Sequence, residues 1–493
     1  MTRTLSCFAV ACALSLLFLG TNASVAAEAP GQLRAGAAAA NITPPLGELI
    51  VGGWRPYPAR HIHDELHARC LVLDDGATRI AFVICDNVGI PREVYDSARK
   101  LIPDSAGLSP ENVLMAATHT HSATTARSQH KLEVPEELAP YQQFIAQRIA
   151  DGLVRAVNNL EPAQIGWGAI AVPEEVFNRR WYMVPGDHEH LRNPFGGTDK
   201  VRMNPPRGSG LLLRPAGPVD PQVSFFSVRS SDGRPIALLA NYSLHYVGGT
   251  GPGAVSADYF AYFADGIQQR LGADRLDPPF VGILTNGTSG DVNNIDFTAT
   301  NSPRRQPYEK MQQVANRVAD AVHKAHEQIT FHDRVPLAMR HAELTLATRR
   351  PTAEQLELAR RITDNPDDAP GWHTHEATYA RRILAQHASP EEVTVLLQAV
   401  RIGDVGIAAI PFEVFTEIGL EIKQKSALPR TFTIELANGS YGYLPTPEQH
   451  AVGGYETWLG SNLVEIEASR KIASTVLGLL NELSSPHEQA AGE

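Results

Sequence analysis

Residues 112–121 have the sequence NVLMAATHTH, an apolar run that stops at Thr118-His119-Thr120-His121. Four other apolar runs stop in the same way, at polar residues suited to metal binding or acid–base chemistry. They are residues 80–85 before Asp86, 235–244 before His245, 279–284 before the polar stretch 285–291, and 405–410 before Pro411-Phe412-Glu413. Ligands collect beyond the carboxyl ends of strands in open sheets, so the five endings predict one shared cleft. The alternative is that each is an ordinary polar residue at the end of a surface strand.

Between these runs the apolar residues repeat every three or four positions, as in amphipathic helices. The helical repeat is clearest over residues 141–157, 311–322 and 463–480. Strands alternating with helices predict an α/β or mixed α+β fold. The 39 glycines and 35 prolines are too many for a helical bundle and suit strands joined by shaped loops.

The composition is that of a globular, acidic protein of 493 residues, 43% of them hydrophobic and 20% charged. These fractions exclude wholesale disorder. The formal net charge of −11 argues against binding to a phosphate backbone, so we expect no nucleic-acid partner.

The N-terminus has the pattern of an export signal. Arg3 is followed by an apolar run over residues 5–19 and by small residues at 24–27. We therefore predict a signal peptide over residues 1–27 and a secreted or periplasmic protein. No later stretch approaches the roughly 20 apolar residues of a membrane span, so no stable membrane insertion is expected.

The rest of the chain is expected to form a single domain over residues 33–483, followed by a flexible tail at 484–493. Residues 351–392 are polar and helical in pattern, and the turn-rich stretch 365–370 interrupts them. We interpret 351–392 as a helical insertion that serves as a lid.

Two cysteines, Cys70 and Cys85, remain after the predicted signal peptide. They lie in two β-like runs, 68–73 and 79–85, joined through Asp74-Asp75-Gly76, which indicates a hairpin. A turn centred there does not place the two cysteines opposite each other. Two buried thiols are therefore favoured over a disulfide, despite the oxidising compartment.

The pattern His-x-His occurs four times, at His61/His63, His119/His121, His188/His190 and His373/His375. Residues two apart on a strand share a face, so both imidazoles can reach one site, and imidazole suits zinc. Only the pair at 119 and 121 follows an apolar run of the buried type. The group around 61–67 is faintly similar to a metallo-β-lactamase cluster, but the order of residues differs. For that group and the two loop pairs a surface or structural role is favoured.

A set of motifs occurs in a fixed order along the chain. The motifs are Thr118-His119-Thr120-His121-Ser122, Asn178-Arg179, Asn241-Tyr-Ser-Leu-His245, Ser256-Ala-Asp258-Tyr259, Gly290-Asp291-Val292, Pro411-Phe-Glu413, and Tyr443-Leu-Pro-Thr-Pro-Glu448 followed by Tyr455. In this order they resemble the neutral ceramidase family of zinc amidases. Each motif is weak alone, but the ordered set is specific and extends over roughly residues 33–480.

The resemblance implies one catalytic zinc ion. The ligands that it implies are His119, His245, Glu413 and Tyr443. Two neutral imidazoles and a carboxylate leave positive charge on the metal, enough to acidify a water or polarise a carbonyl. Catalytic, substrate-orienting roles are implied for His121, Arg179 and Tyr455, as donors to the oxyanion of a tetrahedral intermediate. For the two tyrosines the alternative is ordinary aromatic packing.

The chain departs from the family pattern beside Gly290-Asp291-Val292. The family has a serine next, whereas this chain has Asn293, and an amide cannot form an acyl-enzyme. We expect attack by zinc-activated water, with Asn293 as a further catalytic residue that hydrogen-bonds the water or the oxyanion. Ser289 is a less favoured substitute nucleophile. The Gly-Pro-Gly usual after the second histidine is also replaced, by residues 123–127 at the pocket entrance, so ceramide itself is an open question.

The function that follows from the resemblance is exported, zinc-dependent hydrolysis of an N-acyl amide, a small molecule or lipid such as N-acylsphingosine. Similar ceramidases carry a C-terminal immunoglobulin-like domain, and none is expected here. Two alternatives stay open: a zinc amidase or esterase acting on a non-lipid cell-wall or glycan substrate, and a zinc-binding pseudoenzyme. The acyl and amine groups and the oligomeric state are not predicted.

Overall fold

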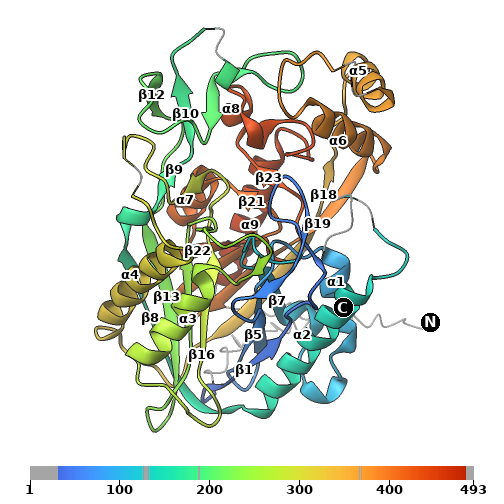
Figure 1. The fold of residues 1–493 in the computed structure, drawn as a ribbon. Helices are drawn as coiled ribbons and strands as arrows, with labels where there is room; N and C mark the ends of the chain where they lie inside the picture. Colours follow the sequence, from blue (N-terminus) through green and yellow to red (C-terminus); the bar gives the residue numbers. More distant parts are fainter. Residues whose placement is uncertain are drawn as a thin grey trace, which may run out of the picture. The chain divides into compact units, whose positions relative to one another are not determined.

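The largest sheet has eight strands in the described part of the chain, in the order β16-β14-β13-β8-β1-β5-β6-β7 (Figure 1). Their bounds are β1 Arg34–Asn41, β5 His67–Asp74, β6 Arg79–Cys85, β7 Val113–Ala117, β8 Glu161–Ala171, β13 Gln222–Ser230, β14 Pro235–Tyr242 and β16 Val281–Asn286. Neighbouring strands are antiparallel except at the two edges, where β6 pairs with β7 and β14 with β16 in parallel. Each parallel pair is joined through a helix, α1 (Arg92–Leu101) and α3 (Tyr259–Arg270) respectively.

A second sheet has the strand order β18-β19-β20-β22. Its strands are β18 Leu337–Ala347, β19 Glu392–Ile402, β20 Val405–Ile410 and β22 Arg430–Glu435. The last two are parallel and are joined through α7 (Thr416–Lys425). The two large sheets together therefore hold three parallel strand pairs, each joined through a helix, and all three contribute to the site described below.

The two sheets share one apolar core. Phe82 of β6, Phe226 of β13, Met339 of β18 and Ile407 of β20 belong to the same buried cluster. Packing this core fixes the position of each sheet relative to the other, because core side chains interlock at near-crystalline density.

Helices cover the outer faces of the sheets (Figure 1). Helix α2 (Pro140–Asn158) packs on β1 and β5, α3 and α4 (Glu309–His326) pack together over β16 and β8, and α9 (Ala468–Ser484) packs on β18 and β19. Each buries an apolar stripe of helical period, as Ile145, Ile149 and Leu153 do in α2. The other elements are β2 Leu49–Ile50, β3 Tyr57–Pro58, β4 His61–Ile62, β9 Phe177–Asn178, β10 Arg180–Met183, β11 Val201–Met203, β12 Leu212–Pro215, β15 Ala254–Val255, β17 Val292–Asn293, β21 Glu413–Val414, β23 Tyr443–Leu444, α5 Ala353–Asp364, α6 Glu376–Ala388 and α8 Pro447–His450.

This computed structural model describes residues 31–484 except 125, 127–131, 133, 187, 188, 302, 366 and 368. All of the described residues belong to one unit, Pro30–Ser485. The predicted signal peptide and all but the first residue of the predicted tail lie outside them. Helices α5 and α6 occupy the segment interpreted as an insertion, and its role as a lid stays a prediction. Among the helices described, none is both long and apolar enough to cross a membrane.

The predicted mixed α/β class is confirmed, and the predicted strands agree with β6, β7, β14, β16 and β20 to within a few residues. The helix expected over 463–480 is partly wrong, since α9 begins only at Ala468. The preceding residues are extended: Val464 bridges Thr348, and the carbonyl of Leu463 accepts from the Arg349 N–H at 2.9 Å. Backbone pairing with the end of β18 thus replaces the first helical turn.

The predicted hairpin between residues 68 and 85 is formed by β5 and β6, with Asp74 opposite Arg79. This register places Cys70 opposite Val83 and Cys85 opposite Ala68. Both cysteines are free, buried thiols, as predicted. Burial raises the pKa of Cys70 to about 12, and that of Cys85 also rises.

Protein that begins at residue 30 should expose no thiol to the reagent DTNB while folded and two thiols after unfolding in guanidinium chloride without reductant. Burial keeps the reagent out and keeps both sulfurs protonated, and thiolate is the reactive form. A chain that releases no thiol after unfolding would instead contain the disulfide.

Candidate active site

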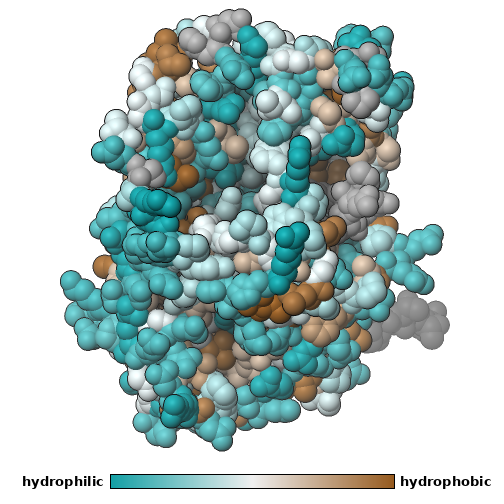
Figure 2. Space-filling model, in the orientation of Figure 1, coloured by the Kyte–Doolittle hydropathy of each residue, from teal (hydrophilic) through white to brown (hydrophobic). Residues whose placement is uncertain are grey.

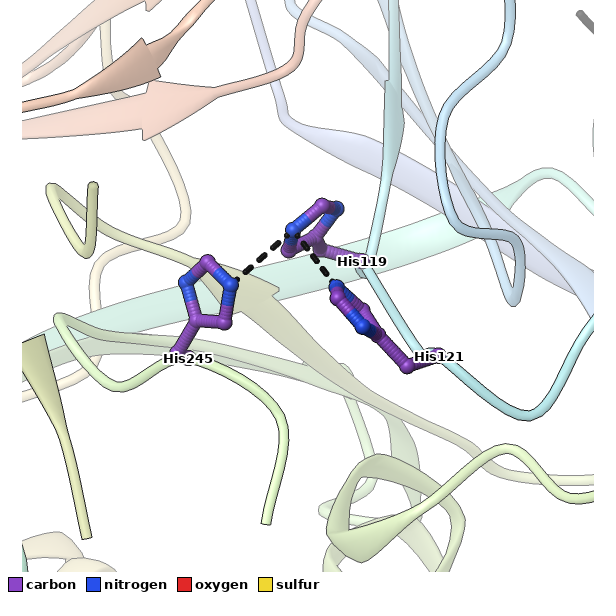
Figure 3. A group of neighbouring side chains, drawn as sticks. All are labelled: His119, His121 and His245. Carbon is purple, nitrogen blue, oxygen red and sulfur yellow. Dashed lines mark hydrogen bonds between the residues drawn. The ribbon is translucent and has the colours of Figure 1, made fainter. Parts of the chain in front are cut away.

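Three histidines from two different parallel strand pairs meet at one point. His119 and His121 follow β7, and His245 follows β14. The His119 Nε2 lies 3.2 Å from the His245 Nε2 and 3.1 Å from the His121 Nε2. Figure 3 shows the three rings facing one another, and one ring nitrogen of each lies within 4.8 Å of the others.

The outer nitrogens of two of these rings are held by backbone carbonyls. The His119 Nδ1 lies 2.6 Å from the carbonyl oxygen of Val88, and the His245 Nδ1 lies 3.1 Å from that of Ser289. A carbonyl can only accept, so each Nδ1 carries the proton and each Nε2 presents its lone pair inward. His119 also has a φ of 68°, a conformation that few non-glycine residues adopt and that is typical of functional sites.

A carboxylate and a phenol come from the third parallel pair. Glu413, after β20, places its Oε2 3.4 Å from the His119 Nε2. Strand β21 pairs in parallel with β23, and Glu413 is the direct partner of Tyr443 in that register. Gly290 allows this arrangement, because a Cβ at 290 would lie 2.5 Å from the carbonyl oxygen of Glu413.

The geometry fits a tetrahedral zinc site. Zinc bonds to nitrogen and oxygen are about 2.0–2.2 Å long, so the ligand atoms of a tetrahedron lie about 3.3–3.6 Å apart. The distances from the His119 Nε2 to His245 and Glu413 are close to these values. Burial, and then the charges of Arg179 and the other histidines, lower the pKa of His245 well below its usual value, which keeps this ring neutral and able to bind a metal ion. Burial, and then Glu413, raise the pKa of Tyr443, so a phenolate here requires positive charge nearby.

Arg179 supplies fixed positive charge beside Tyr443. Its guanidinium lies over the Tyr443 ring at 5.4 Å, and it donates to the Glu456 Oε1 at 2.9 Å and to the carbonyl of Gly290 at 2.8 Å. Arg180, the next residue, donates to the other Glu456 oxygen at 2.7 Å. The Glu456 side chain is completely buried, so one carboxylate holds two buried cations in place.

The remaining motif residues fix the loops around the site. Asp258, with a φ of 59°, caps α3 and accepts from the N–H groups of Val247 and Gly248, which follow His245. Asp291 accepts from the Asn178 side chain at 2.8 Å and from the Thr416 N–H at 2.9 Å, which links the loop after β16 to α7.

Asn293 and Ser289, the two candidates around the missing serine, lie in different surroundings. The Asn293 amide donates to the Asn204 Oδ1 at 2.8 Å and accepts from the Ile295 N–H at 2.9 Å. Ser289 is fully buried behind His245, on the Nδ1 side of the ring, where its hydroxyl donates to the Glu435 Oε1 at 2.6 Å. This position separates the Ser289 hydroxyl from the point at which the histidine Nε2 atoms meet.

Glu435 is the site residue that the sequence interpretation missed. It accepts from the hydroxyl of Ser289, which lies 3.2 Å from the His245 Nδ1, and from the Val414 N–H at 2.7 Å. It therefore orients His245 through the serine. The sequence signal was weak, because the strand β22 that ends at Glu435 has the sequence RTFTIE and contains only two apolar residues, Phe432 and Ile434.

Of the four His-x-His pairs, only the one at 119 and 121 belongs to a potential metal group among the residues that the structure describes. His63 instead stacks on Tyr308 with ring centroids 3.6 Å apart and bonds the Tyr262 hydroxyl at 2.8 Å. His188 lies outside the described residues. His373 and His375 line a pocket that also contains Tyr455.

The comparisons with known proteins agree with the motifs. The sequence model for the N-terminal part of neutral/alkaline non-lysosomal ceramidase matches residues 33–330. The chain belongs to this ceramidase family. Its fold is similar to that of the crystal structure of neutral ceramidase from Pseudomonas aeruginosa, with a TM-score of 0.67 and 19% identity over 94% of this chain and 76% of that one. A ceramidase complexed with C2 matches with a TM-score of 0.65 and 18% identity over 94% and 77% of the two chains.

The predicted resemblance to neutral ceramidases is thereby confirmed, and membership of this ceramidase family supports hydrolysis of amides as the activity. The structure brings together His119, His121, His245, Glu413, Tyr443 and Arg179, and Tyr455 follows with its ring centroid 5.6 Å from that of Tyr443. The individual roles of these residues stay predictions.

Replacing Glu456 by glutamine should lower the free energy of unfolding by about 3–5 kcal/mol, because Arg179 and Arg180 would lose their shared buried counter-charge. Glu467→Gln is the matched control. Glu467 pairs with the exposed Arg470, and such pairs contribute less than about 1 kcal/mol. Denaturant unfolding measures both, and equal shifts would show that the buried network contributes no more than a surface pair.

Proposed function

We propose that this protein is an exported zinc-dependent hydrolase of linear N-acyl amides. The observation that carries the proposal is the convergence of three imidazole Nε2 atoms and a carboxylate oxygen beside Tyr443 and Arg179. The family resemblance, and not the distances, distinguishes the two ligands His119 and His245 from His121. Family membership supports an amide substrate, and a related ceramidase has been crystallised in complex with C2. Export to the periplasm or the exterior is supported by Arg3 and the apolar run over residues 5–19.

The proposed zinc ligands are His119, His245, Glu413 and Tyr443. Zinc bound there would act as a Lewis acid that polarises the amide carbonyl and lowers the pKa of a water molecule. The protein's own contribution is to hold the rings. Val88 and the relay from Ser289 to Glu435 fix the tautomers of the two histidines and orient their lone pairs.

The other side chains are proposed to stabilise the charge that develops on the amide oxygen. His121 stacks on Tyr246 with ring centroids 3.7 Å apart, which fixes the direction of its Nε2 beside the His119 Nε2. Arg179 is held in place by Glu456, and Tyr455 lies next to Tyr443. Preorganised donors of this kind stabilise an oxyanion without having to reorient during the reaction.

Water, and not a side chain, is proposed as the attacking group. Ser289 is engaged on the far side of His245, and the chain has Asn293 where the family pattern has a serine. The Asn293 amide is held by Asn204 and Ile295, so it would serve as a fixed polar group at the edge of the site.

The zinc assignment predicts different results for the two histidines of one motif. His119→Ala, like His245→Ala and Glu413→Ala, should remove about one equivalent of zinc as measured by inductively coupled plasma mass spectrometry. His121→Ala should retain zinc but lower kcat by about 10²–10³-fold, because it removes a donor and not a ligand. Release of fatty acid from an N-acyl amide measures the rate. Equal zinc loss in the His119 and His121 variants would make both of them ligands, and full zinc occupancy in all four variants would refute the site.

The direct-water mechanism predicts that no acyl-enzyme forms. Neither a pre-steady-state burst of amine nor an acylated Ser289 peptide should be detected by rapid quench and mass spectrometry. Ser289→Ala should remain active, with a reduction that Glu435→Gln reproduces, since both changes loosen His245 and neither removes a nucleophile. An acyl group on Ser289 would contradict this mechanism.

A further inference from the structure

A pocket of about 470 Å³ adjoins the proposed zinc site, within the range of small-molecule sites. Its walls come from five parts of the chain: Trp54, the segment 189–192, residues 199–204 with Arg202 of β11, the segment 372–375 that precedes α6, and the stretch from Gly454 to Trp458. The segment expected to be an insertion thus forms one wall. Figure 2 shows that the surface over this part of the chain, around β10, α6 and α8, is mostly hydrophilic.

Three contacts connect this pocket to the proposed catalytic centre. The ring of Tyr455, in the pocket wall, lies against Tyr443, and Asn204, also in the wall, accepts from Asn293. The loop of Trp54 touches the histidines, since a Cβ on Gly52 would lie 2.2 Å from the carbonyl oxygen of His121. A substrate with its amide at the catalytic centre would therefore have this pocket beside it.

Arg202 brings a poorly compensated cation to this pocket. Its Nη1 donates to the carbonyl of His190 at 3.1 Å, but its buried Nε has no hydrogen-bond partner among the described residues. Burial lowers the pKa of Arg202, and Glu189 opposes this effect. Burying a cation without a matching anion costs free energy. A bound anionic ligand would offset that cost.

Neither acidic residue of the wall forms a salt bridge with Arg202 among the described residues. Both oxygens of Asp199 face other donors: they accept from the Gly454 N–H at 2.9 Å, from the Trp458 Nε1 at 2.7 Å and from the Asn193 amide at 3.0 Å. Glu189 is exposed to solvent.

The rest of the wall combines aromatic and polar groups with three aliphatic side chains, Leu191, Val201 and Met203. Arg192 lies over the Trp372 ring at 4.1 Å, and Trp54 stacks on His375 with ring centroids 3.8 Å apart. Burial, and then the charges of His375 and Arg202, lower the pKa of His373 to about 4, so it is a neutral hydrogen-bonding ring at pH 7. The Arg202 guanidinium and the neutral polar rings suit a carboxylate, which accepts paired hydrogen bonds from arginine. A purely hydrocarbon chain would leave Arg202 without an anionic partner.

We propose that this pocket binds a carboxylate of the substrate, so that the enzyme prefers N-acyl amides that carry an acidic group, such as N-acyl amino acids, over ceramide. This inference rests on the proposed amide hydrolysis. The carboxylate can belong to the amine half or to the acyl half of the amide, and substrates of both kinds are tested.

The first experiment compares isosteric substrates with the wild-type enzyme. N-lauroylglutamate is compared with its diamide, and the mono-dodecylamide of glutaric acid with the corresponding neutral glutaramide, all below micelle concentration, with N-lauroylsphingosine as the ceramide. Released lauric acid or dodecylamine is measured. In at least one of the two pairs, the charged substrate should have a kcat/KM about 10–100-fold higher than its neutral partner and than the ceramide. A factor of this size corresponds to the contribution of a hydrogen bond to a charged group.

The second experiment locates the effect. Arg202→Gln should lower kcat/KM for the preferred charged substrate by about 10–100-fold, mainly through KM, and leave its neutral partner unchanged. Arg214→Gln is the matched control, because Arg214 lies over Tyr182 on the other side of β10, outside the pocket. Arg202→Lys, which keeps the charge, should recover part of the affinity and guards against a folding defect in the glutamine variant.

Neutral substrates and ceramide cleaved as fast as the charged ones would overturn the carboxylate pocket while leaving the proposed function intact. An equal loss on charged and neutral substrates in Arg202→Gln would do the same. If no amide is hydrolysed, the proposed function fails. In that case a binding measurement tests the carboxylate pocket independently of activity. Three of the five tryptophans line the pocket, so N-acetylglutamate should quench tryptophan fluorescence in the wild type and not in Arg202→Gln. Equal quenching, or none in either protein, would refute the pocket assignment.

Discussion

The site depends on bringing two imidazole nitrogens and a carboxylate oxygen to within 3.1–3.4 Å of the His119 Nε2. Such an arrangement is unfavourable by itself, because it concentrates partial negative charge away from water. It persists because each group is held by a contact on the side that faces away from the shared point. The carbonyl of Val88 holds His119, the Ser289 and Glu435 relay holds His245, and the parallel pairing of β21 with β23 holds Glu413 beside Tyr443. The strained backbone at His119 is part of the same constraint.

The three parallel strand pairs explain why these groups meet. Each pair ends at the site: β7 leads to His119, β14 to His245 and β20 to Glu413. The partner strand of each histidine supplies support within the same pair: Val88, which follows β6, holds His119, and Ser289, which follows β16, holds His245. Because both sheets pack around one apolar core, the positions of the three ends are fixed together, and none can move without disturbing the others.

Charge is arranged around this centre in two layers. The completely buried Glu456 holds both Arg179 and Arg180 but balances only one of their two charges, so the positive charge beside Tyr443 is fixed by the fold. Farther out, the pocket contains arginine side chains in a protein whose net charge is −11. An acidic protein repels anions at long range, so recognition of a carboxylate would depend on these local groups, within about 10 Å at physiological salt.

The sequence by itself determined which strands are followed by residues suited to metal binding or catalysis, and which family the motifs resemble. Apolar runs that stop at His119, His245 and Glu413 can be recognised locally, since burial requires unbroken apolar residues and the chemistry requires polar ones. The hairpin and the free thiols also follow from short-range spacing. The start of α9 did not, because Val464 pairs with Thr348, more than a hundred residues away, and local periodicity does not contain that contact. Only the tertiary structure decided that Glu435 supports His245, that Ser289 lies behind the ring, and that His373 and His375 face Tyr455 across a pocket. These are contacts between distant segments, and they are fixed by how the sheets pack and not by any single stretch of sequence.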